Sequence, residues 1–217
     1  MDNSISKLLK YVAISLLFSL CGFVFGELFI PARIASLGSL FLGIFFIITL
    51  IASLFLKKGR NFSLTMNKVY IFTFFHGICI YPVINYYTYS LGISTVLGVL
   101  IGTISVFACL SIYASKNNTN KVLYFGPILS CVLIGLLIMN IINIFIVSNT
   151  INIISSSIGV VLFTVYIIHS ITTFKYASNY INLSNADDFA PFVLNLYTDF
   201  INLFMHILRL LNSINRD

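Results

Sequence analysis

A group of polar residues near the end of the chain has the spacing of one face of a helix. Its successive members are 7, 4, 3, 4 and 3 residues apart, which at about 100° per residue places all six within an arc of about 80°. A carboxylate is a hard oxygen ligand for cations, and an imidazole titrates near neutral pH. The members of this polar stripe are Asp188, Asn195, Asp199, Asn202, His206 and Arg209.

The other faces of the same segment carry Leu, Phe, Ile and Val, so the surroundings of the stripe must be considered. Exposed to lipid, Asp199 alone would cost at least about 2.5–3.5 kcal/mol, so we expect the stripe to face a bundle interior or a water-filled cavity. Short polar side chains can also join helices, at about 0.6 kcal/mol per contact. Such contacts do not need an aspartate, a histidine and an arginine on one face, so we favour a hydrophilic pathway.

The composition of the whole chain places this stripe in a membrane. The 217 residues are 59% hydrophobic and 8% charged, and the mean hydropathy is +1.03. Soluble domains carry roughly 25% charged residues. The composition therefore excludes a cytosolic enzyme, a secreted disulfide scaffold and a nucleic-acid-binding domain. The net charge of +6 is expected to set membrane topology.

The chain contains long, continuous apolar segments that can act as membrane spans. A helix needs about 20 apolar residues to cross ~30 Å of hydrocarbon, and continuous segments favour helices over the alternating strands of a barrel. The sequence thus predicts an all-α membrane protein, a single polytopic domain over residues 1–217 with seven transmembrane helices. The predicted spans are 8–30, 34–56, 69–87, 91–113, 122–146, 151–174 and 189–211.

The distribution of basic residues predicts a cytoplasmic N-terminus, because Lys and Arg concentrate in cytoplasmic loops. Of the basic residues, only Arg33, Arg209 and Arg216 fall in connections assigned to the opposite side of the membrane. A re-entrant seventh segment would keep Arg209 and Arg216 on the cytoplasmic side. The basic residues assigned to the cytoplasmic side are Lys7, Lys10, Lys57, Lys58, Arg60, Lys68, Lys116, Lys121 and Lys175.

Other ionisable groups inside the predicted spans are few. Glu27 is close to the outer interface beside Arg33, and we expect it to be solvated. For His76 and His169 we favour a hydrogen bond to a neighbouring carbonyl over a functional role. The four cysteines are dispersed within apolar spans, which supports neither a disulfide nor a zinc site.

Glycines with GxxxG spacing predict close helix packing in two of the spans. Gly22 and Gly26 form one such pair, and Gly98 and Gly102 form another. This spacing lets two helix backbones approach closely in lipid. Packing within one chain is favoured over dimerisation.

Several segments, in chain order, resemble the Bax inhibitor-1 family (transmembrane Bax inhibitor motif proteins). The run LNLYTDFINLF at 194–204, continued by LRLL at 208–211, closely resembles the C-terminal signature of that family. Residues 77–82 are similar to its third-span Gly-x-x-x-x-Pro, and Ile158-Gly159, Phe163 and the segment 166–168 are similar to its sixth span. The resemblance covers nearly the whole chain.

The resemblance implies a seven-helix fold with the last helix surrounded by the other six. It also implies a calcium leak pathway whose pH sensor is a pair of aspartates, one on each of the last two helices, sharing a proton. Asp199 matches the aspartate of the seventh helix and is the expected Ca²⁺ ligand. The sixth-helix aspartate corresponds to Ser170, four residues after Tyr166, so pH sensing is expected to be weakened. The expected pathway residues are Asp199, Ser170, Asn202, His206, Asn195 and Arg209.

These observations together predict an integral membrane calcium leak channel, with Ca²⁺ as the transported ion and no resident cofactor. The alternative is a regulatory membrane protein that restrains a membrane protease or a cell-death effector. Little chain outside the spans, at 57–68 and 175–188, is available to bind such a partner. No enzyme motif such as HExxH occurs. The lipid bilayer is the expected environment, and a bacterial plasma membrane is the expected location.

Overall fold

The computed structural model describes residues 3–38, 64–117, 119–180 and 183–216, and these residues form helices and their connections, with no strand among them. Residues 32–38 are helical, but most of the predicted span 34–56 lies outside the described residues. Two short 3₁₀ helices, η1 (Asn120–Phe125) and η2 (Ala186–Phe189), precede α5 and α7. The long helices are α1 (Asn3–Phe29), α3 (Met66–Leu91), α4 (Ile93–Lys116), α5 (Gly126–Ile146), α6 (Asn149–Ser178) and α7 (Ala190–Ile214).

Five of these helices are long and apolar enough to cross a membrane: α1, α3, α4, α5 together with η1, and α6. The prediction of an all-α membrane protein is therefore confirmed for the described residues. The full set of seven spans is not, because the second lies mostly outside those residues and α7 is not among the five. Helix α7 has 25 residues, but polar side chains interrupt its apolar sequence.

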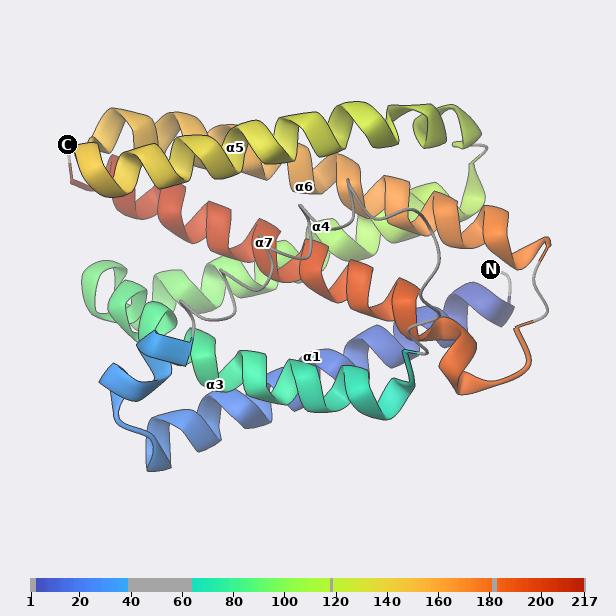
Figure 1. Ribbon diagram of the computed structural model, residues 1–217, viewed down its shortest axis with the longest axis horizontal. Coiled ribbons are helices and arrows are strands. Elements are labelled where there is room, and N and C mark those ends of the chain that lie inside the picture. The colour runs from blue at the N-terminus through green and yellow to red at the C-terminus, as the bar shows by residue number, and fades with distance from the viewer. Residues whose placement is uncertain (1–2, 39–63, 118, 181–182, 217) are drawn as a thin grey trace.

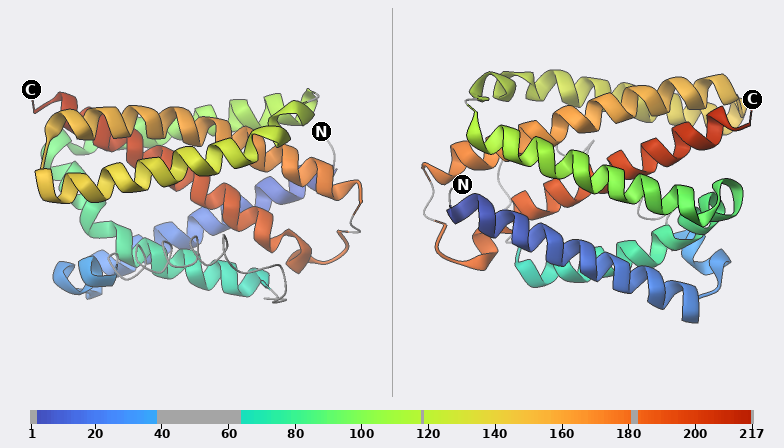
Figure 2. Two further views of the ribbon diagram at one scale, coloured as in Figure 1. Left: turned by 45° about the horizontal axis from the view of Figure 1, so that its top comes forward. Right: turned by 180° about the vertical axis from the view of Figure 1, so that it is seen from behind.

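Helix α7 runs through the middle of the bundle and contacts α1, α3, α4 and α6 (Figure 1). Its burial is not confined to one face, since Leu196, Tyr197, Leu203 and Leu208 are all nearly inaccessible to solvent. Helix α6 is the neighbour it contacts most extensively, and α1 packs chiefly on α3. The views in Figure 2 show the same arrangement, with α7 between the pair α1 and α3 and the pair α5 and α6. Helix α7 is thus shielded from lipid by other helices, which lets a membrane protein contain polar residues in a span.

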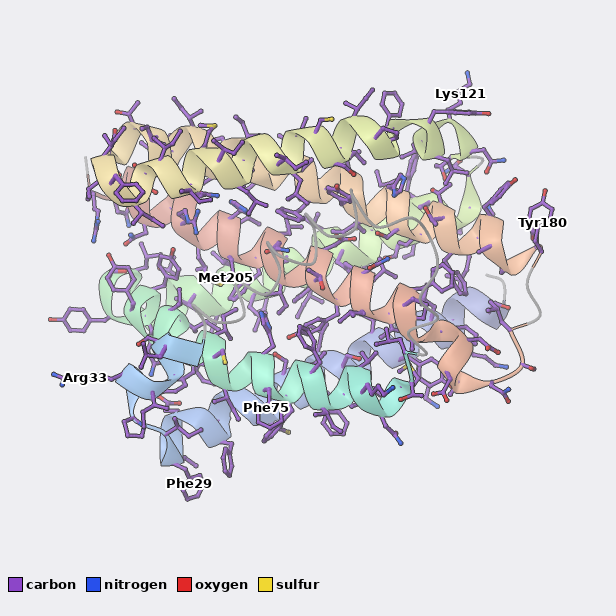
Figure 3. All side chains as sticks on the ribbon, in the orientation of Figure 1. Phe29, Arg33, Phe75, Lys121, Tyr180 and Met205 are labelled. Atoms are coloured by element: carbon purple, nitrogen blue, oxygen red, sulfur yellow. The ribbon has the colours of Figure 1, made fainter. Side chains whose placement is uncertain are left out.

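The two ends of the bundle carry different basic residues. Lys121 lies at the end where α1 begins, whereas Arg33 lies at the opposite end (Figure 3). The Lys175 ammonium donates to the carbonyl oxygens of Ser115 and Asn117, at 3.0 and 3.3 Å, and so caps the C-terminus of α4. The C-terminus lies at the end of the bundle opposite the N-terminus, and α7 runs along the length of the bundle (Figure 1). Which end faces the cytoplasm stays a prediction.

Two aspartates in η2, directly before α7, cap the starts of helices. Asp187 accepts a hydrogen bond from the backbone nitrogen of Met66, at 2.8 Å, where α3 begins. Asp188 accepts one from the backbone nitrogen of Asn185, at 2.8 Å, in a capping box. The expectation that Asp188 belongs to the polar stripe is wrong, because it lies in η2 and caps that turn.

Glycines allow α1 and α3 to touch through their backbones. A Cβ atom at Gly22 would overlap the carbonyl oxygen of Phe74, and one at Gly77 would overlap the carbonyl oxygen of Ser19. The first GxxxG pair therefore packs within the chain, as predicted. A Cβ at Gly98 or Gly102 meets no atom of the described residues within 4 Å, so the second pair makes no such contact there.

Replacing Gly77 with alanine is expected to lower stability by about 1–3 kcal/mol, because the added methyl group forces α1 and α3 apart. The measurement is thermal unfolding in detergent. Gly98→Ala is the matched control, since the same methyl group has free space there and alanine favours helix. Equal loss of stability in both variants would show that the backbone contact between α1 and α3 is unimportant.

Candidate functional site

The interface between α6 and α7 brings Ser170 and Asp199 together. The Ser170 hydroxyl donates a hydrogen bond of 2.6 Å to Oδ2 of Asp199, which is only 7% exposed. Ser170 is eight residues before the end of α6 at Ser178, and Asp199 is nine residues after the start of α7 at Ala190. The two side chains therefore lie at the same level of two antiparallel helices. The prediction that Asp199 is inside the bundle and faces the sixth span is confirmed.

Neutral hydroxyl groups of α6 lie near the Asp199 carboxylate. Tyr166, one turn before Ser170 on α6, is close to both Asp199 and Ser130 of α5. Hydroxyl oxygens can donate to a carboxylate and can also serve as ligands for a hard cation. The carboxylate thus lies in a polar site formed with neutral hydroxyl groups of α6.

His206 lies further along the same interface. Its imidazole stacks on the ring of Phe163 of α6, with centroids 5.4 Å apart and planes at 25°. The ring rests against Gly159, where a Cβ atom would overlap it. Within the described part of the chain, the buried Nδ1 atom of His206 has no hydrogen-bond partner.

Arg209 and two asparagines complete the α7 residues predicted for the site. The Arg209 guanidinium is half-buried and donates from Nη1 to Oδ1 of Asn140 on α5, at 2.8 Å. Asn202 is half-buried. Asn195 is exposed, so the expectation that it shares the buried face is wrong. It lies within the first two turns of α7, near the end of the bundle, where neighbouring helices cover less of it.

We use the term α6–α7 seam for the surface at which α6 packs against α7. The α6 positions recur every three or four residues, which is the spacing of one helix face. Sequence reasoning identified Ser170 through a family resemblance, but it missed the partners of His206, although the same spacing was present in the sequence. The seam consists of Gly159, Phe163, Tyr166 and Ser170 on α6, with Asp199 and His206 on α7; Arg209, almost one turn beyond His206, bonds Asn140 of α5.

A second buried polar cluster lies on another face of α7. The Tyr197 hydroxyl is 2.7 Å from Nδ1 of His76 on α3 and donates to the Ser19 hydroxyl on α1, at 3.0 Å. Tyr197 is 1% exposed. The expectation that His76 bonds a carbonyl is wrong, since its partner is a tyrosine. Sequence reasoning missed Tyr197 because nothing in its local pattern distinguishes it from a core residue.

Replacing Tyr197 with phenylalanine should lower stability by about 1–3 kcal/mol, because His76 and Ser19 lose a buried hydrogen-bond partner. The change is measured by thermal unfolding in detergent. Tyr89→Phe serves as the control, since Tyr89 is 94% exposed. An unchanged melting temperature for Tyr197→Phe would contradict a stabilising role for this cluster.

The remaining ionisable candidates lie outside the seam. His169 hydrogen-bonds the backbone of Leu123, as expected from the sequence, and packs against Gly126 at the start of α5. Glu27 is exposed and accepts a hydrogen bond of 3.3 Å from Asn85. Neither group therefore contributes to the buried interface between α6 and α7.

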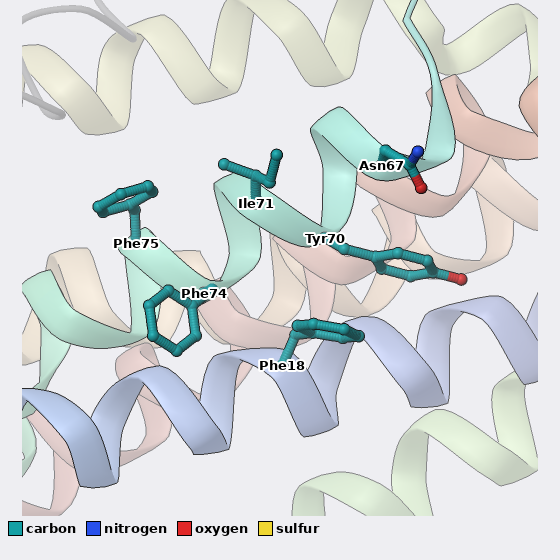
Figure 4. Close-up of a pocket in the computed structure, with 6 residues that line it drawn as sticks. All are labelled: Phe18, Asn67, Tyr70, Ile71, Phe74 and Phe75. Atoms are coloured by element: carbon teal, nitrogen blue, oxygen red, sulfur yellow. The ribbon is translucent and has the colours of Figure 1, made fainter.

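An open groove occurs elsewhere on the molecule, between α1 and α3 (Figure 4). Its lining includes no residue of α6 or α7 and is almost entirely apolar. Among the described residues, no three His, Cys, Asp or Glu side chains are grouped closely enough to hold a metal ion. Asp199 is thus a single carboxylate among neutral groups. The groove is lined by Phe18, Asn67, Tyr70, Ile71, Phe74 and Phe75.

The fold and the seam define a helical integral membrane protein with polar and ionisable groups sealed between its central helix and a neighbour. The sequence profile of the family described as Inhibitor of apoptosis-promoting Bax1 matches residues 1–217. The chain therefore belongs to the Bax inhibitor-1 family, and the resemblance noted in the sequence is confirmed.

Relatives of the chain occur in bacteria, viruses and animals. An uncharacterized protein of Helicobacter pylori strain J99 is 26% identical over 204 residues, covering 93% of this chain and 83% of the relative. The Golgi anti-apoptotic protein of Vaccinia virus strain Lister is 26% identical, covering 78% and 70%. Protein lifeguard 4 of Mus musculus is 28% identical, covering 86% and 71%. The similarity thus extends over most of each protein.

Proposed function

We propose that the protein lets Ca²⁺ cross its membrane passively along the α6–α7 seam. The observation that carries this proposal is the buried Asp199 carboxylate, hydrogen-bonded to Ser170 of the neighbouring helix. A buried carboxylate at membrane depth is costly and marks ion pathways by default. Polar groups continue along α7 to His206 and Arg209, whereas hydrogen bonds between helices alone would not need these ionisable residues.

The chemistry of the site suits passage better than storage of calcium. Ca²⁺ takes six to eight oxygen ligands, and tight sites use several carboxylates. Asp199 supplies one charge, with the hydroxyls of Ser170 and Tyr166 nearby as neutral oxygens. Water must complete the shell. Conduction requires binding that attracts an ion yet releases it, and a single carboxylate meets that requirement.

The positive charge of Arg209 would repel a passing cation and so limit the calcium leak. Asn140 holds its guanidinium through the hydrogen bond to Nη1. We expect Arg209 to act as an electrostatic barrier on the side of His206 away from Asp199. We therefore expect passage to be slow.

Purified protein in liposomes with a trapped calcium dye tests the proposal. Vesicles with the protein should gain dye signal faster than protein-free vesicles when Ca²⁺ is added outside. An ionophore at the end of each trace reports the amount of trapped dye and intact vesicles. Equal rates with and without protein would contradict the proposal.

A regulatory role is the second candidate, and the printed description of the Vaccinia relative as anti-apoptotic favours it. In that role the protein restrains a membrane protease or a cell-death effector. The liposome experiment separates the two functions, because a regulator without its partner carries no ions. The bacterial relatives support a bacterial plasma membrane as the location. The concentration of basic residues on one set of connections supports a cytoplasmic N-terminus.

A further inference from the structure

The rings of His206 and Phe163 fill the seam between Asp199 and Arg209. His206 is seven residues beyond Asp199 on α7, about 10 Å along the helix axis, and Arg209 is three residues further. The imidazole and the phenyl ring are stacked, and they are only 7% and 5% exposed. An ion that moves along the seam from Asp199 towards Arg209 must pass this pair.

The close fit of the imidazole depends on a glycine. A Cβ atom at position 159 would overlap three atoms of the His206 ring, so the ring lies directly on the α6 backbone at Gly159. The adjacent Ile158 is 38% exposed and points elsewhere. With α6 backbone on one side and Phe163 stacked on the ring, the described residues leave this level of the seam closed to water.

His206 also carries an unsatisfied polar atom. Its Nδ1 is buried without a hydrogen-bond partner among the described residues, whereas buried polar groups are nearly always paired. Separation of the two rings would let a water molecule, or a water bound to an ion, reach this nitrogen. Among the described residues, the closed arrangement thus contains a polar atom that solvent entering the seam would satisfy.

The geometry points to His206 and Phe163 as the constriction that sets the rate of ion passage through the seam. Narrow constrictions lined by apolar or aromatic groups stop ions by excluding water. The Nδ1 atom of His206 is then the first polar group that the hydration shell of an ion meets when the rings part. This inference rests on the proposed function and adds to it that the rings limit the flux of the ions that Asp199 attracts.

The test compares calcium entry into dye-loaded liposomes for the parent and a set of variants. Removing the imidazole with His206→Ala should raise the initial rate at least about threefold, because the constriction loses one of its two walls. His206→Phe keeps a ring in place and should be no faster than the parent. Ile158→Ala, on the same turn of α6 as Gly159, is the control and should leave the rate unchanged. Thermal unfolding in detergent establishes that each variant is folded.

If His206→Ala fails to fold, Phe163→Leu removes the other ring and its rate decides the question in the same way. A folded His206→Ala variant with the parental rate overturns the inference and leaves the proposed function standing. Parent and variants that all match protein-free vesicles overturn both. A silent parent with a conducting His206→Ala variant supports the constriction and contradicts the proposed function, because the parent itself then passes no calcium.

Discussion

Replacing Asp199 with asparagine is expected to slow calcium entry by about tenfold or more, which corresponds to a loss of about 1.4 kcal/mol or more in the stabilisation of the passing ion. The amide keeps the volume of the carboxylate but has no net charge to attract Ca²⁺. Its oxygen can still accept the hydrogen bond that Ser170 now donates at 2.6 Å. The fold should therefore be retained while the ion loses its charged ligand.

The rate is measured in dye-loaded liposomes at equal protein content, with thermal unfolding as the check on folding. Glu27→Gln is the matched control, because it also removes one carboxylate, but from an exposed position outside the seam. The control should conduct like the parent. Equal rates for Asp199→Asn and the parent would remove Asp199 from the pathway.

Replacing Ser170 with aspartate is expected to create a pH-dependent step that the parent lacks. The contact between Ser170 and Asp199 shows that a second carboxylate at this position would lie against the first. Like charges at this distance cannot both ionise easily, so one carboxyl group keeps its proton towards neutral pH. Release of that proton on raising the pH leaves two negative charges. Calcium flux should therefore change at least about threefold between about pH 6 and 8 in this variant.

The measurement is calcium entry across a pH series for the parent, Ser170→Asp and the uncharged control Ser170→Asn. The calcium flux of the parent should change less over this range than that of Ser170→Asp, since its serine cannot share a proton with Asp199 as a carboxylate does. Steep titration of the parent would mean that another group is the sensor, with His206 or His169 the first to test. In that event Ser170 is not the missing half of a proton-sharing pair.

The polar stripe shows how far helical spacing can predict a site. Steps of three and four residues correctly placed Asp199 and His206 on the buried side of α7. The same spacing failed for Asp188, because the regular progression of 100° per residue stops where η2 precedes α7 at Ala190. Spacing gives an angle around a helix axis, but it does not tell where the helix begins.

Partners from distant parts of the chain could not be predicted in this way. Tyr197 bonds His76 and Ser19 from two other helices, and Gly159 makes room for His206. Each of these contacts depends on how helices are placed against one another, which local periodicity does not encode. Ser170 was matched to Asp199 from the sequence only because the family resemblance supplied the pairing.

Whether calcium crosses between α6 and α7 can be measured by blocking that interface in vesicles whose flux has just been recorded. Ser170→Cys, in a protein whose four native cysteines are replaced, places a thiol beside Asp199. A small thiol reagent is then added, and mass spectrometry reports complete labelling. Ser105→Cys, on an exposed face of α4, is the control. We predict that labelling at 170 abolishes calcium entry and labelling at 105 leaves it unchanged, whereas undiminished entry after complete labelling at 170 would contradict passage through the seam.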